Sequence, residues 1–383
     1  MVTTQTADNV LKSYYLDAVA EQLDKAANPL LAAINKTTQD VAGRDVRKTV
    51  RYGVNGGVGA GTEEGALPSA GGNRYAQFVS TLKNLYGTIE ITDKAIRASN
   101  SSEGAFVNLL NDEMDGLLKS SSFNFGRMLF GDGTGKLCTV TAAADGAYTV
   151  DDTRNLAEGM IVDIYSSGGS QTATGRTVTG VDRTKNTVTL SGAAVTGTGN
   201  YFVLQHSHNL ELTGLGAIFS DSATLYGVDR ETNPWMKPVT LSSVGAITEG
   251  KIQKAIDDVE ERSGSKINFI VCSAGVRRAL FDALASLRNM PVLELEGGVR
   301  ALSFNGIPVV SDRFCPKGTM YLLNTDDFAL HQLCDWQWIE GEDGKVLKQV
   351  AGKPVYTATL VKYAELLCYR PCGQAKLSGI TEA

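Results

Sequence analysis

The chain has 383 residues, of which 43% are hydrophobic, and its 42 acidic residues outnumber its 36 basic residues, giving a net charge of −6. This length suffices for two or three substructures, because a single core stops growing near about 250 residues. The acidic balance argues against a sequence-specific nucleic-acid binder, and the lack of a run of roughly 20 apolar residues argues against a membrane span.

The first predicted element is an amphipathic helix over residues 8–27. Apolar residues recur there at spacings of three and four, and Asp8 can cap the start. Pro29 ends the helix, and Leu30 and Ile34 indicate a further short turn. No basic start followed by an apolar block precedes it, so we predict no secretory signal and synthesis in the cytoplasm.

The most informative segment is the glycine-rich stretch 53–72, in which eight of twenty residues are glycine. Its flanks, 44–52 and 75–92, have the β-branched and aromatic content of strands. We therefore predict an extended hairpin with a mobile tip. One hairpin buries too little apolar surface to offset the ordering of its backbone, so we expect this arm to rest on another subunit.

A long helix is predicted over residues 100–130, with Asn100 and Glu103 at capping-box spacing and Gly131 after its end. Residues 137–204 are rich in Thr, Val and Gly instead, and we predict a small all-β insert there. Its strand-like runs are 159–165, 176–182 and 186–190, with a hairpin loop over 182–186.

From residue 248 onward the pattern predicts a small α/β layer. A helix containing Ile252 and Val259 ends at Gly264, a strand covers 267–272, and a second helix follows Ser273. Short strands are predicted at 305–310, 319–324, 328–333 and 335–340, and a long final strand at 355–369.

Motifs that could carry chemistry give weak signals. Residues 57–61 superficially resemble a dinucleotide loop, but Glu63 and Glu64 follow instead of a helix and would repel a phosphate. His206 and His208 alternate as on one face of a strand, yet two ligands leave a zinc site incomplete. No nucleophile has a neighbouring base, so we predict no catalytic residue, no metal, no cofactor and no enzyme activity.

The six cysteines are scattered and are typical of buried, reduced thiols. Cys368 and Cys372 are four residues apart. On a strand they would share one face at a separation of roughly 13 Å, which is too long for a disulfide. We therefore expect free thiols.

Charged residues gather at both ends of the predicted hairpin. Basic residues crowd its base and acidic residues lie near its tip: Arg44, Arg47, Lys48 and Arg51 at the base, Glu63 and Glu64 at the tip. An arm that reaches over a neighbour could place its acidic tip against a basic surface, so these six residues are candidate inter-subunit contacts. The alternative is a solvated tip with incidental charges.

The order of elements resembles the major capsid proteins of tailed bacteriophages with the Hong Kong 97-type fold. Residues 44–92, the lead-in 91–99, the helix 100–130 and the run 304–330 carry the resemblance. It implies an α+β fold with an N-terminal arm, an extended β-hairpin loop, a long spine helix, an inserted small β domain and an α/β axial domain. The implied function is a structural subunit that forms pentamers and hexamers and closes into an icosahedral shell around double-stranded DNA.

The resemblance also implies a division into domains. The ranges are 1–43 for the N-terminal arm, 44–92 for the extended loop, 93–134 for the peripheral domain with the spine helix, 135–205 for the inserted β domain, 206–246 for the return to the peripheral domain, 247–345 for the axial domain, and 346–383 for the C-terminal strand region that completes the peripheral and axial domains. The type member crosslinks its subunits through a lysine in the extended loop. Residues 53–81 contain no lysine, so we predict no such crosslink.

The partners implied are other copies of the chain, a separate scaffolding protein, a portal, and packaged double-stranded DNA bound without sequence specificity, with no membrane. A separate scaffold is expected because Met1 leads almost directly into the arm, with no scaffold segment before it. The implied location is the virion capsid, assembled in the cytoplasm of a bacterial host. A repetitive tail or decoration protein is the alternative, which an all-β organisation would favour.

Overall fold

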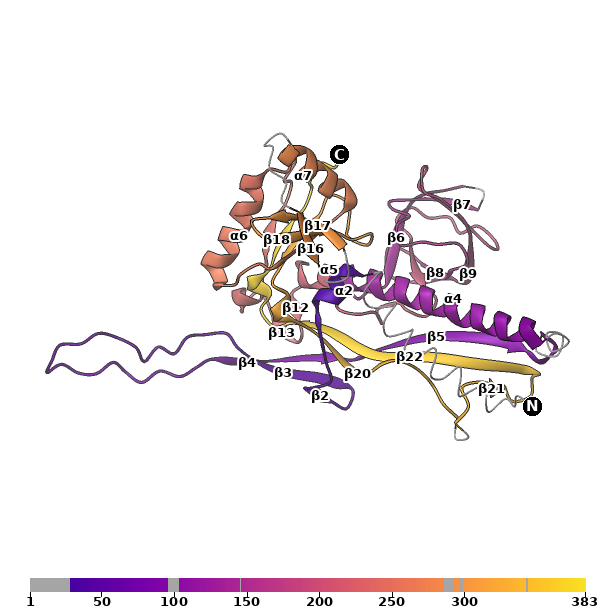
Figure 1. The fold of residues 1–383 in the computed structure, drawn as a ribbon, viewed down its shortest axis with the longest axis horizontal. Coiled ribbons are helices and arrows are strands. Elements are labelled where there is room, and N and C mark those ends of the chain that lie inside the picture. Colours follow the sequence, from indigo (N-terminus) through magenta and orange to yellow (C-terminus); the bar gives the residue numbers. More distant parts are fainter. Residues whose placement is uncertain (1–27, 96–102, 145, 286–291, 296–298, 342–343) are drawn as a thin grey trace.

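The computed structural model of the chain describes residues 28–95, 103–144, 146–285, 292–295, 299–341 and 344–383. The helix predicted over 8–27 and the cap predicted at Asn100 lie outside these residues. Figure 1 shows a long hairpin projecting from the body, a long helix along a sheet, a small barrel, and a sheet with two helices. None of the described helices is long and apolar enough to cross a bilayer.

The short turn predicted after Pro29 is a helix, α2 (Pro29–Ala33), with the proline in its first turn. Proline suits this position because its missing N–H would have no partner there. Leu30 and Leu31 point into the core, as does Ile34 after the helix. The helix thus anchors the start of the described chain to the body.

The predicted long helix is confirmed as α4 (Glu103–Phe130), which ends before Gly131. Its 28 residues extend over about 42 Å. Met114, Leu118 and Phe125 are buried against the sheet below it. Leu117 packs so closely on Gly87 of that sheet that an added Cβ would lie 3.0 Å from its Cδ1 atom. The glycine therefore sets how closely helix and sheet approach.

The sheet beneath α4 is built around the last long strand. Its strands are β1 (Asn35–Thr37), β5 (Lys83–Thr92), β20 (Phe328–Trp338), β21 (Lys348–Gln349) and β22 (Val355–Cys368). Thr357 of β22 lies opposite both Glu90 of β5 and Lys348 of β21, so β5 occupies one edge of β22, and β20 and β21 share the other. Figure 1 shows this sheet extending along the molecule below α4.

Two strand predictions are corrected here. Residues 328–333 and 335–340 were expected as separate strands, but β20 runs through both, with register shifts on either side of Cys334. Such bulges accept extra residues without ending a strand. Residues 75–92 were expected as one strand and form two, because the chain changes sheets at buried Leu82, whose N–H donates to the Arg44 carbonyl at 2.8 Å.

Residues 136–204 form a closed β-barrel in the strand order β10-β7-β6-β11-β8-β9. The strands are β6 (Lys136–Ala144), β7 (Ala147–Val150), β8 (Ile161–Tyr165), β9 (Gln171–Asp182), β10 (Thr187–Leu190) and β11 (Tyr201–Leu204). The predicted hairpin at 182–186 is confirmed, since β9 and β10 pair antiparallel and the Asp182 carboxylate accepts from the N–H groups of Thr184 and Lys185.

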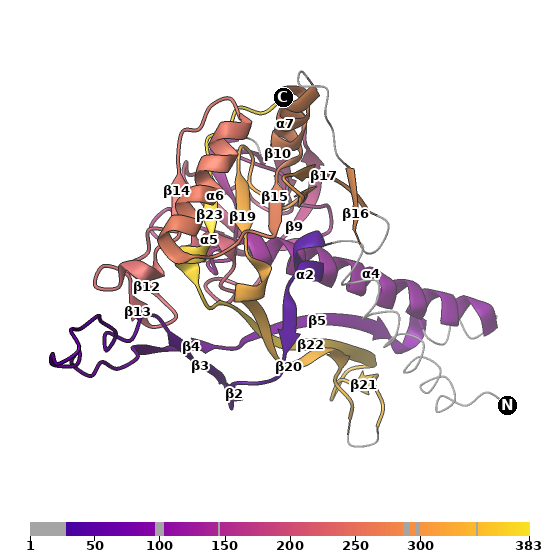
Figure 2. The ribbon, with the colours of Figure 1, turned by 60° about the vertical axis from the view of Figure 1, so that its left-hand side comes forward.

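The remaining large sheet carries the predicted α/β layer. Its order is β14 (Val239–Leu241), β23 (Ala375–Leu377), β19 (Met320–Leu323), β15 (Phe269–Cys272), β18 (Ile307–Ser311), β17 (Val299–Phe304) and β16 (Val292–Leu295), with α6 (Glu249–Ser263) and α7 (Ala274–Ala285) packed on it. Figure 2 shows both helices beside these strands. The cap predicted at Gly264 is confirmed by its left-handed φ of 65°.

One boundary in this sheet differs from the expectation. Residues 305–310 were predicted as a strand, but Asn305 and Gly306 have φ values of 50° and 82° and form the turn between β17 and β18. Asn-Gly is the preferred pair for such two-residue hairpin turns, because both positions need positive φ. The strand itself begins at Ile307.

Among the residues that the structure describes, three apolar cores hold these parts together. One lies between α4, the sheet beneath it and the base of the hairpin, one lies between the seven-stranded sheet and its helices, and one fills the barrel. The fully buried strand β15 serves two of them, since Ile270 faces the helices whereas Phe269 and Val271 face the α4 core. The boundaries of the predicted domains stay predictions.

Short elements complete the described chain. They are β2 (Val41–Ala42), β3 (Asp45–Arg51), β4 (Tyr75–Thr81), α5 (Leu215–Ile218), β12 (Thr224–Leu225), β13 (Val228–Asp229), and three 3-10 turns, η1 (Pro234–Met236), η2 (Thr325–Asp327) and η3 (Pro371–Gly373). β2, β3 and β4 form the small sheet at the base of the hairpin.

Candidate assembly surface

The hairpin predicted from the glycine-rich stretch is confirmed. β3 and β4 pair antiparallel along their whole lengths, from Asp45 opposite Thr81 to Arg51 opposite Tyr75. Val46 and Val50 on β3 and Phe78 on β4 are buried, while alternate residues face outward. This alternation is that of a ribbon with one face packed on the protein and one in solvent.

An aromatic stack anchors the base of the hairpin to the body. The Trp235 ring lies parallel to the Tyr52 ring at 4.6 Å and to the Phe78 ring at 6.1 Å. Phe78 also contacts Tyr226 at 5.5 Å, and the Val79 N–H donates to the Tyr226 carbonyl at 3.0 Å. Because Tyr226 and Trp235 come from the β12–β13 hairpin and η1, residues distant in sequence fix the direction in which the arm projects.

Beyond this stack, residues 53–74 project from the body without covering it (Figure 1). Gly57 and Gly71 lie so close together that a Cβ on Gly57 would sit 2.8 Å from the Gly71 nitrogen. Glycine at both positions lets the two legs approach. The chain reverses where the Gly65 N–H donates to the Thr62 carbonyl at 3.1 Å, which places Glu63 and Glu64 in the reversal.

Three large apolar side chains stand exposed on this projecting segment. Val54, Val58 and Leu67 are 88%, 87% and 90% exposed. Single exposed apolar residues are common, but three on one thin arm form a surface that gains free energy when another molecule covers it. Glu63 and Glu64 were predicted as contacts from their charge, whereas these three uncharged side chains were not predicted as contacts.

The basic residues at the base of the hairpin divide into two groups. Arg44, which precedes β3, and Arg47 on β3 are exposed and lie 3.7 Å from the Asp45 carboxylate, and Arg51 is exposed as well. Lys48 points inward instead, with its ammonium 2.5 Å from the Asp40 carboxylate and 5.4 Å from the centre of the Tyr369 ring. Lys48 therefore ties the hairpin to its own subunit.

The structure places the candidate charges at opposite ends of the arm. Glu63 and Glu64 lie at the far reversal, and the basic residues lie beside the body (Figure 1). The tip cannot reach the base of its own arm. Any pairing between these two sets is therefore between subunits.

A partly buried ion pair stabilises the packing of α4 on the sheet beneath it. The Lys362 ammonium is fully buried between the rings of Phe125 and Trp336 and pairs with Asp335. Burial alone would raise the pKa of Asp335, but Lys362 outweighs it and lowers the pKa to about 2. These contacts join α4 to β20 and β22, so helix and sheet form one support.

The residues singled out for other chemistry lie apart from one another. His206 and His208 were expected on one strand face, but β11 ends at Leu204 and His206 has a left-handed φ of 61° in the turn that follows. Within the described part of the chain, no three His, Cys, Asp or Glu side chains could together hold a metal ion. Cys368 ends β22 and Cys372 lies in η3, so the strand geometry assumed for this pair is wrong.

No family model matches the chain, and no curated protein matches its sequence. Among solved structures, a Cyanophage A-1(L) capsid subunit is similar over 93% of both chains, with a TM-score of 0.56 and 14% sequence identity. The SrpI encapsulin of Synechococcus elongatus PCC 7942 is similar over 95% of both chains, with a TM-score of 0.50 and 10% identity.

The chain has the Hong Kong 97-type capsid fold. The resemblance read from the sequence is thereby confirmed at the level of the fold. At 14% sequence identity, the two chains share the order and packing of their elements but few of their side chains. Among the described residues, the projecting hairpin carries the large apolar side chains with the highest exposed fractions, Val54, Val58 and Leu67.

Proposed function

We propose that the chain is the structural subunit of an icosahedral phage capsid. Copies of it assemble into pentamers and hexamers, and the closed shell encloses double-stranded DNA without reading its sequence. The similarity over nearly the whole length of a cyanophage capsid subunit supports this function. The subunit performs no catalysis in this role.

The observation that carries the proposal is the hairpin with an anchored base and an uncovered tip. Its base is stacked on Trp235, so its direction is fixed before assembly. Its tip exposes Val54, Val58 and Leu67. A rigid base preorganises the contact, and the flexible glycine-rich tip adapts to neighbours in non-identical positions.

The domain division of the sequence analysis belongs to this proposal. In it, α4 is the spine helix of the peripheral domain, residues 247–345 form the axial domain near the capsomer centre, and residues 135–205 form the inserted β domain. The closed barrel at 136–204 supports the last assignment. A separate scaffolding protein, a portal, and assembly in the cytoplasm of a bacterial host complete the proposal.

The six candidate contacts are refined within the same proposal. Arg44, Arg47 and Arg51 face outward at the base of the hairpin and receive the Glu63 and Glu64 of a neighbour. Lys48 serves the subunit itself, because it already pairs with Asp40 and lies over Tyr369.

A closed protein compartment without DNA is a second candidate, favoured by the similarity to an encapsulin. A tail or decoration protein is disfavoured, because the two solved structures described above are a capsid and an encapsulin complex, and because the chain carries long helices as well as sheets. The contents of the particle distinguish the two shell functions.

Electron microscopy of the purified protein, expressed alone and with candidate scaffold proteins, tests the proposal. The expected result is closed shells with fivefold and sixfold capsomers. Nuclease-protected DNA in particles from infected cells supports the capsid function, and shells filled with protein support the compartment. Tubes, or monomers under every condition, would contradict both.

A further inference from the structure

The barrel is a self-contained unit within the subunit. Its strands close on themselves, and its core contains only residues of the barrel, including Val162, Ile164 and Phe202, each 0% exposed. Closure leaves no strand edge to pair with the body. The barrel is therefore attached to the body by the segment that enters it, by the segment that leaves it, and by any contact elsewhere on its surface.

The two connecting segments have the geometry of a pivot. Gly133 and Gly135 on the entering segment have φ values of 88° and 81°, and Asn209 on the leaving segment has a φ of 61°. The Asn209 N–H donates to the Thr134 carbonyl at 2.9 Å, so the two segments run side by side. Two adjacent crossings define one line about which a unit can turn, because a hinge needs only a few loop residues to change φ and ψ.

Firm attachments on both sides confine the bending to these segments. On the body side, the buried guanidinium of Arg127 near the end of α4 binds the Glu211 carboxylate with two hydrogen bonds, of 2.8 and 2.5 Å. On the barrel side, buried Asp163 accepts a hydrogen bond from the His206 N–H at 3.0 Å. His208 also belongs to the barrel side, because its ring stacks on the Tyr165 ring at 4.0 Å and its Nε2 atom lies 3.0 Å from the Tyr201 hydroxyl. The leaving segment can therefore bend at Asn209 and Leu210.

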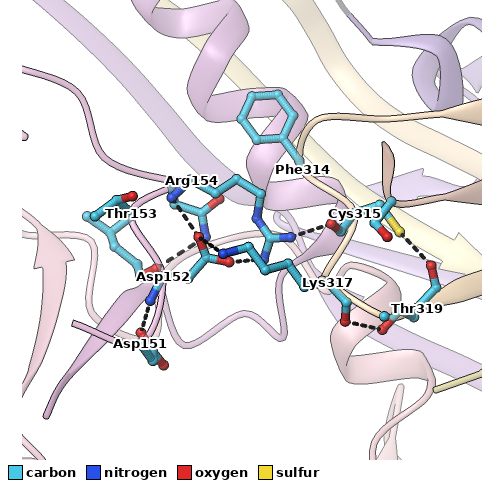
Figure 3. Close-up of polar contacts among 12 residues, drawn as sticks. Asp151, Asp152, Thr153, Arg154, Phe314, Cys315, Lys317 and Thr319 are labelled. Atoms are coloured by element: carbon cyan, nitrogen blue, oxygen red, sulfur yellow. Dashed lines mark hydrogen bonds and ion pairs between the residues drawn. The ribbon is translucent and has the colours of Figure 1, made fainter. Parts of the chain in front are cut away.

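Away from the pivot, one group of polar contacts joins the barrel to the seven-stranded sheet (Figure 3). The Arg154 guanidinium donates to the Cys315 carbonyl, and Asp152 lies 3.4 Å from Arg154 and 3.8 Å from the Lys317 ammonium. In the part of the chain that the structure describes, no other hydrogen bond or ion pair links residues 136–204 to the body outside the two connecting segments.

The barrel side of this contact is rigid. The Asp151 carboxylate accepts from the Thr139 N–H of β6 and from the Asp152 N–H, each at 2.8 Å. Asp152 in turn accepts from the Arg154 N–H at 2.9 Å. A displacement of the Arg154 guanidinium is therefore transmitted to the barrel wall.

The body side of the contact lies where α4 meets the seven-stranded sheet. Phe314, next to Cys315, packs edge to face on Phe123 of α4 at 5.0 Å, and the Arg313 guanidinium lies 4.7 Å from the Phe123 ring centre. The Cys315 carbonyl is thus held in position by both the helix and the sheet. A cavity of about 320 Å³ lined by Arg127, Arg154 and Phe314 lies at this junction, so side chains do not fill the space around the contact.

We propose that the barrel is a hinged module held by a latch, in which Arg154 grips the Cys315 carbonyl and Asp152 pairs with Lys317. The latch closes only when α4 and the seven-stranded sheet have the arrangement seen here. A shift of one against the other opens the latch and frees the barrel to swing about residues 132–135 and 209–210. The device thus couples the orientation of the barrel to the shape of the subunit, whether or not the subunit forms a shell.

Hydrogen exchange of the full chain tests the latch with Arg154→Ala against Lys185→Ala, which removes an exposed cation from the barrel surface. Loss of a hydrogen bond from a charged donor predicts exchange about tenfold faster in Arg154→Ala at residues 209–210 and 312–317. Amides inside the barrel, such as that of Val188, should exchange at the wild-type rate. Lys185→Ala should match the wild type throughout.

Lys317→Ala gives a second test that cannot disturb folding of the barrel, because Lys317 is exposed and lies outside it. We expect hydrogen exchange at the same residues to be about twofold faster in Lys317→Ala than in the wild type. Added salt should produce the same change in the wild type, because it screens the Asp152–Lys317 pair. Unchanged exchange at 209–210 in both variants would overturn the proposal. So would acceleration inside the barrel equal to that at the connecting segments, because the barrel would not then move as a unit.

Discussion

The barrel and the hairpin arm are both β structures that extend from the body of the subunit. They differ in how their strand edges and apolar side chains are covered. The barrel pairs every strand edge and buries its apolar residues within its own wall. Beyond β3 and β4, residues 53–74 of the arm join no sheet of the described chain, and they expose Val54, Val58 and Leu67. A closed unit draws its stability from its own core, whereas an open arm needs a neighbour to cover it.

The two regions also differ in how they join the body. The arm is fixed at its base by the stack of Tyr52, Trp235 and Phe78 and is free at its end. The barrel is firm inside and joined through narrow segments and the contacts of Arg154 and Asp152. The internal stability of each region and its attachment to the body are thus separate properties. A substitution can weaken one of them and leave the other unchanged.

The largest effect is expected from Phe202→Ala in the barrel core. Phe202 is fully buried and contacts the Tyr148 ring at 5.3 Å, so its loss should cost about 3–5 kcal/mol of barrel stability. Hydrogen exchange should accelerate across β6 to β11 and remain unchanged in β3 and β4. Equal acceleration in the arm would show that the two regions are not independent.

Asp163→Asn should reveal a pH dependence that belongs to the barrel. Burial raises the pKa of Asp163, but hydrogen bonds from the N–H groups of His206 and Gly175 and from the Thr174 hydroxyl outweigh it and lower the pKa below 3.8. A lowered pKa stabilises the folded barrel above pH 3.8, and this contribution disappears as pH falls through the folded pKa.

At pH 7 the Asp163→Asn barrel should be about 2 kcal/mol less stable than the wild type, because its amide oxygen is a weaker acceptor. The difference should narrow towards pH 2. Denaturant unfolding at several pH values measures it, with Glu261→Gln on the exposed face of α6 as the control. A stability difference between the wild type and Asp163→Asn that stays constant with pH would contradict a lowered pKa for Asp163.

Trp235→Ala should loosen the base of the arm. Trp235 is half-buried, so we expect a loss of about 2 kcal/mol, roughly half the cost for a fully buried tryptophan. Hydrogen exchange should rise in β3 and β4 and stay unchanged in the barrel, the reverse of the Phe202→Ala result. Trp235→Phe should restore most of the protection by keeping a stacked ring.

Replacing Val54, Val58 and Leu67 together by Ser should leave the unfolding midpoint of the free subunit unchanged, because these side chains touch almost nothing within it. Assembly should weaken by about 1 kcal/mol per side chain covered by a neighbour. Sedimentation of shells against concentration measures this. A triple variant that assembles like the wild type would show that the arm does not bury these residues.

The smallest effect is expected from Glu63→Lys with Glu64→Lys. Exposed ion pairs contribute about 0–1 kcal/mol each, so the double variant should fold normally and assemble less well, most clearly at low salt. Adding Arg47→Glu and Arg51→Glu at the base should restore assembly if the pairing is between subunits. Normal shells from the double variant alone would remove the charge hypothesis.

Sequence periodicity predicted most of the regular elements because they obey local rules. The helix α6 and its Gly264 cap, the α4 helix, and the hairpin at 182–186 all follow from spacing and turn chemistry. The glycine-rich arm was recognisable for the same reason, because a segment without large core residues cannot pack on itself.

What the sequence could not show depends on contacts between distant residues. Nothing local signals that the strand after Tyr75 changes partners at Leu82, or that Trp235 stacks on Tyr52. Lys48 looks like its neighbours Arg47 and Arg51 until the fold brings Asp40 and Tyr369 beside it. Asn305-Gly306 carried a local turn signal, which was mistaken for the start of a strand.

Hydrogen exchange of residues 53–74 and of the barrel, in free subunits and in assembled shells, tests whether the arm draws its stability from a neighbour. We predict that the tip exchanges at nearly the rate of an unfolded chain in the free subunit and becomes strongly protected in the shell, while the barrel interior is protected equally in both. A tip that stays unprotected after assembly would contradict the claim that the arm draws its stability from a neighbour.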